Sequence, residues 1–184
     1  MEELIKEELE EFIKLIKKNN SKPFDCINQF NLPILNALWK VTSGNRFDYD
    51  DRRLITIVEK LSLWFKRMGR PEDVLTFAFP WMTKIYPKFN EYDQTLDITH
   101  GIMDMMKESI EEHEKTLDVN DPRDFTDKFL IEMTKTTNPD SSFYGEKGRL
   151  NLANTLFDLF LAGSETTSTT LTWAMLYMAR NYIY

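Results

Sequence analysis

Cysteine is nearly absent from the sequence, and its scarcity limits both the fold and the compartment. Cys26 is the one cysteine among 184 residues, so no disulfide can form within the chain. This suits a reducing compartment or a location that faces the cytosol. Because Cys26 lies in the stretch KPFDCINQF, we interpret it as a small buried hydrophobic residue.

Long apolar runs and an excess of positive charge are also missing. No uninterrupted apolar segment approaches the ~20 residues that span a bilayer, and Met1 is followed by two glutamates rather than by a basic and then apolar leader. We therefore expect no membrane anchor within the chain. The formal net charge of −7 argues against a broad nucleic-acid-binding surface.

Hydrophobic and aromatic residues are plentiful enough to form a globular core. They make up 42% and 13% of the chain, which argues against disorder. Apolar residues recur at every third or fourth position in most segments, without an alternating strand pattern of useful length. The sequence therefore predicts an all-α protein in one unit over residues 1–184. We expect about six helices, at residues 2–18, 31–43, 52–69, 92–117, 123–135 and 150–180.

The last predicted helix contains an unusual polar stretch, AGSETTSTT, at residues 162–170. Serine and threonine are indifferent helix formers, so a purely structural helix would not need them. Thr166 is placed to turn its hydroxyl back to the carbonyl of Ala162. An acid beside that hydroxyl would make a proton path, but a helix-packing patch of small residues explains the pattern equally well. At about 100° per residue, one face holds Asp158, Ala162, Glu165, Thr166, Thr169 and Trp173.

This stretch resembles the long central helix of the cytochromes P-450, the haem-thiolate monooxygenases. Their signature, Ala/Gly-Gly-any-Asp/Glu-Thr-Thr/Ser, is matched by residues 162–167. Upstream, LPILNALWKVTSGNRFDYDD resembles the region of the family's fourth and fifth helices, and FPWMTKIYPKF the loop between its F and G helices. EEHEKTLDVNDPRDFTDKFL resembles the G-to-H junction of microsomal, drug- and steroid-metabolising members. The resemblance implies a partial cytochrome P-450 domain, about the D to I helices, that ends in the central helix.

The resemblance also implies roles for residues of the central helix. Ala162 and Gly163 would form the groove for the haem face and for dioxygen. Thr166 would lie at the haem as well, hydrogen-bond the bound dioxygen and help to deliver protons, which Glu165 would feed from solvent. The residues that would border the substrate are Asp158, Leu161 and Ala162.

The aromatic segment between the F and G helices is assigned to the pocket or to the membrane. Its residues Phe77, Phe79, Trp81 and Met82 would roof the substrate pocket or dip into the membrane surface. For any one of these side chains, ordinary core packing is an equally good explanation.

Several parts of the family pattern have no counterpart in the chain. The family holds its iron through a cysteine thiolate, but Cys26 has the wrong surroundings, so no metal ligand is assigned. We interpret EKGR, residues 146–149, as a chance match to the family's Glu-x-x-Arg motif in a glycine-containing loop. His100 and His113 are expected to face solvent. Residues 182–184 stand where family members usually continue with Pro-Glu, which suggests an unspliced intron or an incomplete gene model.

The favoured hypothesis is a fragment of a monooxygenase that oxidises small apolar substrates of the xenobiotic, steroid or fatty-acid class. The resemblance implies haem as cofactor, dioxygen, and electrons from an NADPH-dependent reductase. It also implies a parent enzyme on the cytosolic face of the endoplasmic reticulum membrane, which it would touch through the F–G region. The fragment alone is expected to be inactive. Two alternatives stay open, a catalytically dead helical fragment that at most binds partners or ligands, and a helical scaffold unrelated to haem.

Overall fold

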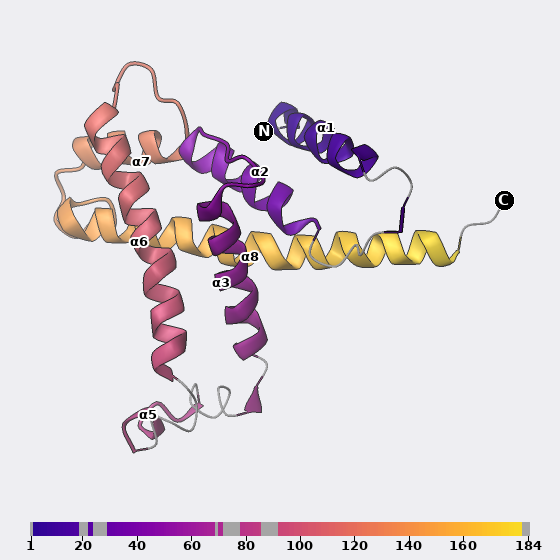
Figure 1. Cartoon of the computed structure of the whole chain (residues 1–184). Coiled ribbons are helices and arrows are strands. Elements are labelled where there is room, and N and C mark those ends of the chain that lie inside the picture. Colours follow the sequence, from indigo (N-terminus) through magenta and orange to yellow (C-terminus); the bar gives the residue numbers. More distant parts are fainter. Residues whose placement is uncertain are drawn as a thin grey trace.

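The computed structural model of the chain describes residues 2–18, 22–23, 29–68, 70–71, 78–85 and 92–181. Every regular element within these ranges is a helix, which confirms the predicted fold class (Figure 1). Cys26, which the sequence analysis interprets as buried, lies outside the described residues. The helices are α1 (Glu2–Lys18), α2 (Asn31–Ser43), α3 (Arg52–Met68), α5 (Met82–Ile85), α6 (Tyr92–Thr116), α7 (Phe125–Lys135) and α8 (Gly145–Arg180).

The long helix α8 is the axis of the fold. Its 36 residues extend over about 54 Å, and α2, α3, α6 and α7 all contact it. Figure 1 shows α3 and α6 crossing α8, while the C-terminal part of α8 projects beyond the other helices. The side chains of α8 that are buried are Leu152, Ala153, Leu156, Phe160, Ser164 and Ser168, together with Gly148. One face of α8 therefore packs against the core, and the opposite face is available for other contacts.

The core lies where α2, α3 and α6 meet the first half of α8. Trp39 of α2 packs edge-on against Phe160 of α8, with ring centroids 5.4 Å apart. Each fully buried large apolar side chain contributes about 1.5–3 kcal/mol relative to exposure, so this cluster fixes the crossing of the helices. Its other fully or almost fully buried members include Leu35, Leu54, Ile57, Leu61, Ile102, Met106, Ile110, Leu152 and Leu156.

Local signals explain where two of the helices begin and end. Helix α2 ends at Gly44, whose φ of 68° lies in the left-handed region that glycine adopts without strain. Helix α7 begins after Asp124, whose carboxylate accepts a hydrogen bond from the backbone N–H of Asp127 at 2.9 Å. An aspartate cap satisfies one of the free N–H groups of a first turn. These two ends lie next to each other, since a β-carbon on Gly44 would approach Asp124 Oδ2 to 2.9 Å.

Helix α8 begins about five residues earlier than predicted, so the assignment of residues 146–149 to a loop was wrong. Gly148 lies within the helix, and the position requires a glycine because a β-carbon there would lie only 2.5 Å from the carbonyl oxygen of Phe143. Arg149 bonds to α6 instead of to Glu146, with its Nε 3.0 Å from Glu114 Oε1 and its Nη2 3.3 Å from Glu111 Oε1. The glycine marks a close approach of the backbone, which a sequence pattern cannot distinguish from a loop.

A buried carboxylate fastens α1 to the rest of the fold. Glu8 is only 4% exposed, and its carboxylate accepts hydrogen bonds from Arg46 Nε at 2.7 Å and from the Tyr49 hydroxyl. Burial raises the pKa of Tyr49, so its hydroxyl stays protonated and keeps donating. The amphipathic pattern predicts the helix but not this anchor, since Glu8 lies among other acidic residues of α1.

The isolated 184-residue chain is expected to aggregate. Trp173 and Tyr177 are 68% and 71% exposed on the projecting part of α8, with Leu171, Leu176 and Met178 beside them. An apolar patch of several hundred Å² favours self-association at about 25 cal/mol per Å² buried. Size-exclusion chromatography with light scattering measures this, and the double variant Trp173→Gln, Tyr177→Gln should raise the monomer fraction. A monodisperse wild-type monomer with a cooperative thermal transition would contradict the expectation.

Candidate functional site

The face of α8 opposite the core is accessible along the polar stretch. Ala162 and Thr166 are both exposed here, and Glu165 lies half-buried at the edge. We call this surface the open face; its exposed members are Asp158, Ala162, Thr166, Thr169 and Trp173. A small alanine between longer side chains lets a bulky or flat group approach the helix backbone. The arrangement agrees with the single face that helical spacing predicts.

The hydroxyls of the polar stretch bond back to the helix itself. Thr166 Oγ1 donates to the carbonyl oxygen of Ala162 at 2.6 Å, which confirms the predicted contact. Thr170 Oγ1 does the same to Thr166 O at 2.8 Å, and Thr172 Oγ1 to Ser168 O at 2.9 Å. Such bonds tend to bend a helix. A hydroxyl has one donor and two lone pairs, so Thr166 keeps its acceptor capacity for a group on the open face.

Glu165 carries an unpartnered oxygen. Its Oε2 atom is buried and has no hydrogen-bond partner among the described residues. A buried polar atom without a partner costs about 1–3 kcal/mol, so such an atom is rarely kept without a reason. Glu165 directly precedes Thr166 in the sequence.

Gly163 lies on a different side of α8 from Ala162. A β-carbon placed on Gly163 would lie 3.0 Å from Leu38 Cδ1 of α2. Ala162 by contrast is exposed on the open face. The two small residues that the sequence groups together therefore meet different neighbours, and the assignment of Gly163 to a haem groove stays a prediction.

The residues predicted to border the substrate are spread over several environments. Asp158 is exposed on the open face, whereas Leu161 packs partly buried against the core. Phe79 is exposed, with its ring centroid 6.5 Å from that of exposed Trp81. Phe77 and the side chain of Met82 lie outside the described residues. No helix among the described residues has the length and apolarity that would carry it across a bilayer.

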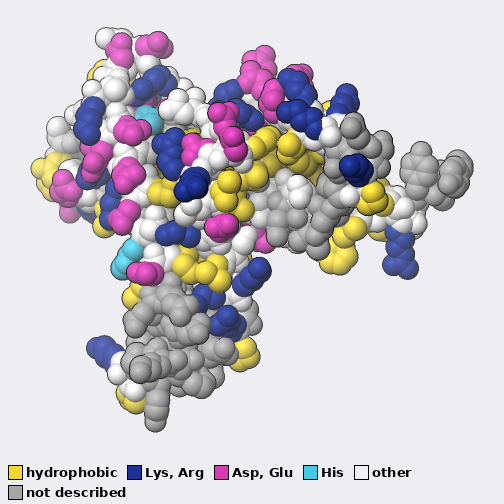
Figure 2. Space-filling model, in the orientation of Figure 1, with side chains coloured by type: hydrophobic (Ala, Val, Ile, Leu, Met, Phe, Trp, Pro, Cys, Tyr) yellow, Lys and Arg dark blue, Asp and Glu magenta, His cyan; other side chains and the backbone are white. Residues whose placement is uncertain are grey.

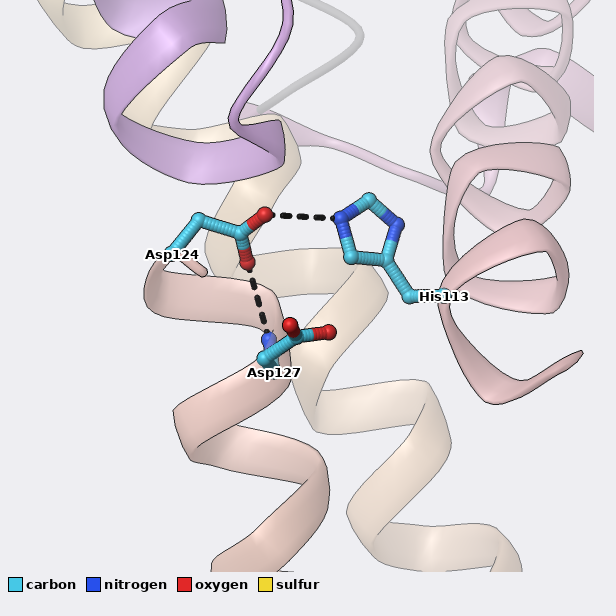
Figure 3. Close-up of side chains that lie close together, drawn as sticks. All are labelled: His113, Asp124 and Asp127. Atoms are coloured by element: carbon cyan, nitrogen blue, oxygen red, sulfur yellow. Dashed lines mark hydrogen bonds and ion pairs between the residues drawn. The ribbon is translucent and has the colours of Figure 1, made fainter. Parts of the chain in front are cut away.

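His113 is buried, so the prediction that it faces solvent was wrong; His100 is exposed as expected. Figure 3 shows His113 pointing from α6 toward Asp124 at the start of α7. Its Nδ1 lies 2.6 Å from the carbonyl oxygen of Ser109, and its Nε2 lies 2.9 Å from Asp124 Oδ2. Both partners are hydrogen-bond acceptors, so both ring nitrogens are placed to donate, which favours the protonated imidazolium. The hydrogen bond to Asp124 raises the pKa of His113 above its usual value.

The acidic pair beside this imidazolium is fully engaged in structural contacts. Asp127 accepts hydrogen bonds from Arg123 Nε at 2.6 Å and Nη2 at 2.8 Å, and the ion pair with Arg123 lowers the pKa of Asp127. His113, Asp124 and Asp127 lie close enough to share an ion, but a metal ligand needs a free nitrogen lone pair. We therefore assign the cluster to the α6–α7 junction. Of the contacts in this cluster, the sequence indicates only the N-cap, because Asp124 directly precedes an apolar helix.

An apolar groove lies on the other side of α8, between α1, α2 and the helix. It has a volume of about 320 Å³, and Figure 2 shows hydrophobic side chains gathered beneath the charged outer face of α1. Gly163, Thr167 and Leu171 line it from α8, whereas Ala162 and Thr166 do not. The groove was not predicted, because it is formed by helices that are far apart in the sequence.

Comparison with a family model and comparison with known proteins identify the same family. The family model described as "Cytochrome P450" matches residues 1–182. Cytochrome P450 2J2 of Homo sapiens is 35% identical over 97% of the chain, and Cytochrome P450 2J5 of Mus musculus is 34% identical over 97%. Cytochrome P450 2C28 of Mesocricetus auratus is 34% identical over 98% of the chain. The match spans 35%, 34% and 36% of the three relatives, so the chain corresponds to about a third of their length.

Proposed function

Because the chain belongs to the cytochrome P450 family, we propose that it forms part of a haem-dependent monooxygenase. The parent enzyme would oxidise small apolar organic substrates with dioxygen and electrons from an NADPH-dependent reductase. One observation carries the proposal beyond family membership. The Thr166 hydroxyl bonds to Ala162 O on the open face, and the preceding residue, Glu165, has a buried carboxylate oxygen without a hydrogen-bond partner among the described residues.

The open face would accept a haem. A flat group needs a helix surface with a small side chain, and Ala162 provides it between exposed neighbours. Ala162 and Thr166 would contact the haem face, with Gly163 contributing backbone. The haem would supply the activation of dioxygen that inserts one oxygen atom into a C–H bond. The cysteine that ligates the iron is not assigned to this chain.

The residues of the open face would manage protons. The Thr166 hydroxyl is held by Ala162 O, so its lone pairs point away from that carbonyl and can accept a proton. When it donates outward, the Ala162 carbonyl is released and can accept from water. Glu165 has a free carboxyl oxygen with which to reload the hydroxyl. General acids of this kind contribute typically 10²- to 10⁴-fold to a rate.

The substrate would lie along the same face of α8. Asp158 precedes Ala162 by one helical turn and would border it, as would the part of Leu161 that the core leaves exposed, while Phe79 would close it from the segment after α3. Exposed Phe79, Trp81 and Ile85 would let this segment touch a membrane surface. The parent would thereby be held at the cytosolic face of the endoplasmic reticulum.

A second candidate function is suggested by the apolar groove between α1, α2 and α8. An apolar groove of about 320 Å³ falls within the size range of small-molecule sites. The chain alone could then act as a catalytically dead module that binds a partner or an apolar ligand. The two functions differ in their location on α8, since the groove and the open face lie on different sides.

The proposed function is tested by the spectrum of the reduced, carbonyl-bound haem. The full-length protein is expected to give the Soret band of a thiolate-ligated haem, because the family holds its iron by cysteine. The 184-residue chain, mixed with haem, is expected to give none. A full-length protein without this band would overturn the proposal, and a thiolate band from the short chain would show that its ligand lies within residues 1–184.

A further inference from the structure

Apolar side chains are exposed at the end of the fold that carries α5. Phe79 and Trp81 are 47% and 58% exposed, with their ring centroids 6.5 Å apart. Ile85 of α5 is 57% exposed, and Leu63 of α3 is 43% exposed. Figure 1 shows α5 beyond the lower ends of α3 and α6. Apolar groups gathered at one end of a molecule mark a surface that meets a protein or a membrane.

Basic residues accompany these apolar side chains. Lys66 of α3 and Lys84 of α5 are both exposed, and neither makes an ion pair with a described residue. The described residues between 60 and 85 include no acid, and residues 60–94 as a whole contain six basic and four acidic residues. This end is therefore positively charged, although the chain has a net charge of −7. We call the surface the α5 end; its members are Leu63, Lys66, Phe79, Trp81, Lys84 and Ile85.

The acidic residues gather toward the other end of α6. Residues 104–149, which include the second half of α6, all of α7 and the start of α8, contain twelve acidic and seven basic residues. Figure 2 shows Asp and Glu side chains over this part, whereas the coloured charged side chains at the lower end are Lys and Arg. A molecule with its charge separated in this way is oriented by a charged surface, with its positive end toward a negative one.

The combination of apolar and basic groups fits a membrane surface that contains anionic lipids. Aromatic rings are favoured at the headgroup level of a bilayer, and lysines beside them can meet anionic headgroups there. Neither signal alone gives stable attachment, which takes apolar insertion together with a basic patch or a second anchor. An acidic protein would satisfy the lysines, but the exposed rings and Ile85 also need an apolar partner, which the acyl region of a bilayer supplies.

We propose that the α5 end docks on anionic lipid headgroups, with Phe79, Trp81 and Ile85 in the membrane interface and Lys66 and Lys84 paired with the headgroups around them. The proposal rests on the membrane contact in the function proposed above and adds a lipid selectivity to it. A lysine close to an anionic surface strengthens binding by roughly 5-fold, and salt weakens this attraction.

The test uses the full-length protein and vesicles whose acyl chains carry bromine, which quenches tryptophan fluorescence on contact. Subtracting the signal of Trp81→Phe isolates the quenching of Trp81, since phenylalanine keeps an aromatic ring at the surface. Vesicles with roughly a third phosphatidylserine should quench Trp81 more than pure phosphatidylcholine vesicles do, and less so at high salt. In the double variant Lys66→Gln, Lys84→Gln, the part of the quenching that depends on phosphatidylserine should fall by roughly 5-fold or more.

The double variant Lys128→Gln, Lys135→Gln is the matched control, because it removes the same charge from exposed positions on α7. It should leave the quenching of Trp81 unchanged. Equal quenching of the wild-type protein by both kinds of vesicle would overturn the proposal, and this is the result expected if the lysines serve an acidic protein. Equal losses in the two double variants would also overturn it.

The vesicle measurement does not depend on the state of the haem. A wild-type protein without a thiolate carbonyl spectrum would contradict the proposed function, whereas a normal spectrum with quenching that is indifferent to phosphatidylserine would contradict the lipid selectivity alone. The two failures are therefore distinguished.

Discussion

Replacing Thr166 with alanine in the full-length protein is expected to lower the product formed per electron by roughly 10- to 100-fold. The hydroxyl is the only side-chain group that bonds to Ala162 O among the described residues, and alanine can neither accept nor donate a proton. Substrate and haem binding should change little, because the side chain is exposed rather than packed. Electrons that do not reach product should appear as hydrogen peroxide. Measuring NADPH consumed, product and peroxide together tests the prediction.

Thr170→Ala is the matched control for this experiment. Thr170 makes the same bond to the carbonyl four residues earlier, at 2.8 Å, and is also exposed. Its removal should leave the ratio of product to peroxide unchanged. Glu165→Gln should give a milder defect than Thr166→Ala, since water can partly replace a carboxyl group as the proton source. If Thr166→Ala lowers only the yield of folded protein and leaves the ratio unchanged, the hydroxyls are structural.

Replacing Asp124 with alanine should destabilise the full-length protein by about 3–5 kcal/mol, the range for breaking a buried ion pair from one side. Asp124 caps α7 and neutralises the buried His113 imidazolium. Its loss leaves a cation at 6% exposure without its carboxylate. Thermal unfolding followed by circular dichroism measures the effect. The exposed Asp118, which accepts only from the N–H of Asn120 at 2.9 Å, offers a control, and Asp118→Ala should change stability by about 0.5 kcal/mol or less.

The α6–α7 junction also predicts how the folding stability changes with pH. The pKa of His113 is raised in the folded protein, so the imidazolium stabilises the fold fully below its unfolded pKa of about 6.5. This contribution is lost as the pH rises through the folded-state pKa, because the deprotonated Nε2 then turns a lone pair toward Asp124. Asp124→Asn keeps an acceptor for the helix cap but removes the charge. In Asp124→Asn, the free energy of unfolding should no longer fall over this pH range. If it falls as in the wild type, another group is responsible for the pH dependence.

Helix positions were predictable where apolar spacing and caps act together. The stretch at residues 31–43 was predicted with the bounds that α2 has, because an apolar repeat is followed directly by the left-handed Gly44. Helix α8 was placed too late, because Gly145 and Gly148 were interpreted as a loop when Gly148 serves a close backbone approach. Single residues do not reveal which backbone atoms will pass beside them.

In the candidate site too, contacts within one helix were predictable, whereas contacts between distant segments were not. The bond from Thr166 to Ala162 follows from helical spacing alone, so it was predictable. The burial of His113 depends on Asp124 eleven residues later and on the packing of α7 against α6. Likewise, the neighbour of Gly163 comes from α2, more than a hundred residues earlier. Contacts between distant segments require the tertiary structure, and these contacts decide which side of α8 is open.

The unbroken course of α8 has a consequence for insertions and deletions. From Gly145 to Arg180 no turn separates the buried residues such as Leu152 and Leu156 from the open face. One residue inserted between Leu156 and Ala162 would therefore rotate the open face by about 100° relative to the core, and carry Thr166 away from its position. An insertion of seven residues there would nearly restore the phase but lengthen the helix by about 10 Å. The effect of a substitution on α8 can thus be offset by a second substitution at a neighbouring residue. A change in length between its two halves cannot be offset in this way, because it rotates every later residue relative to the core.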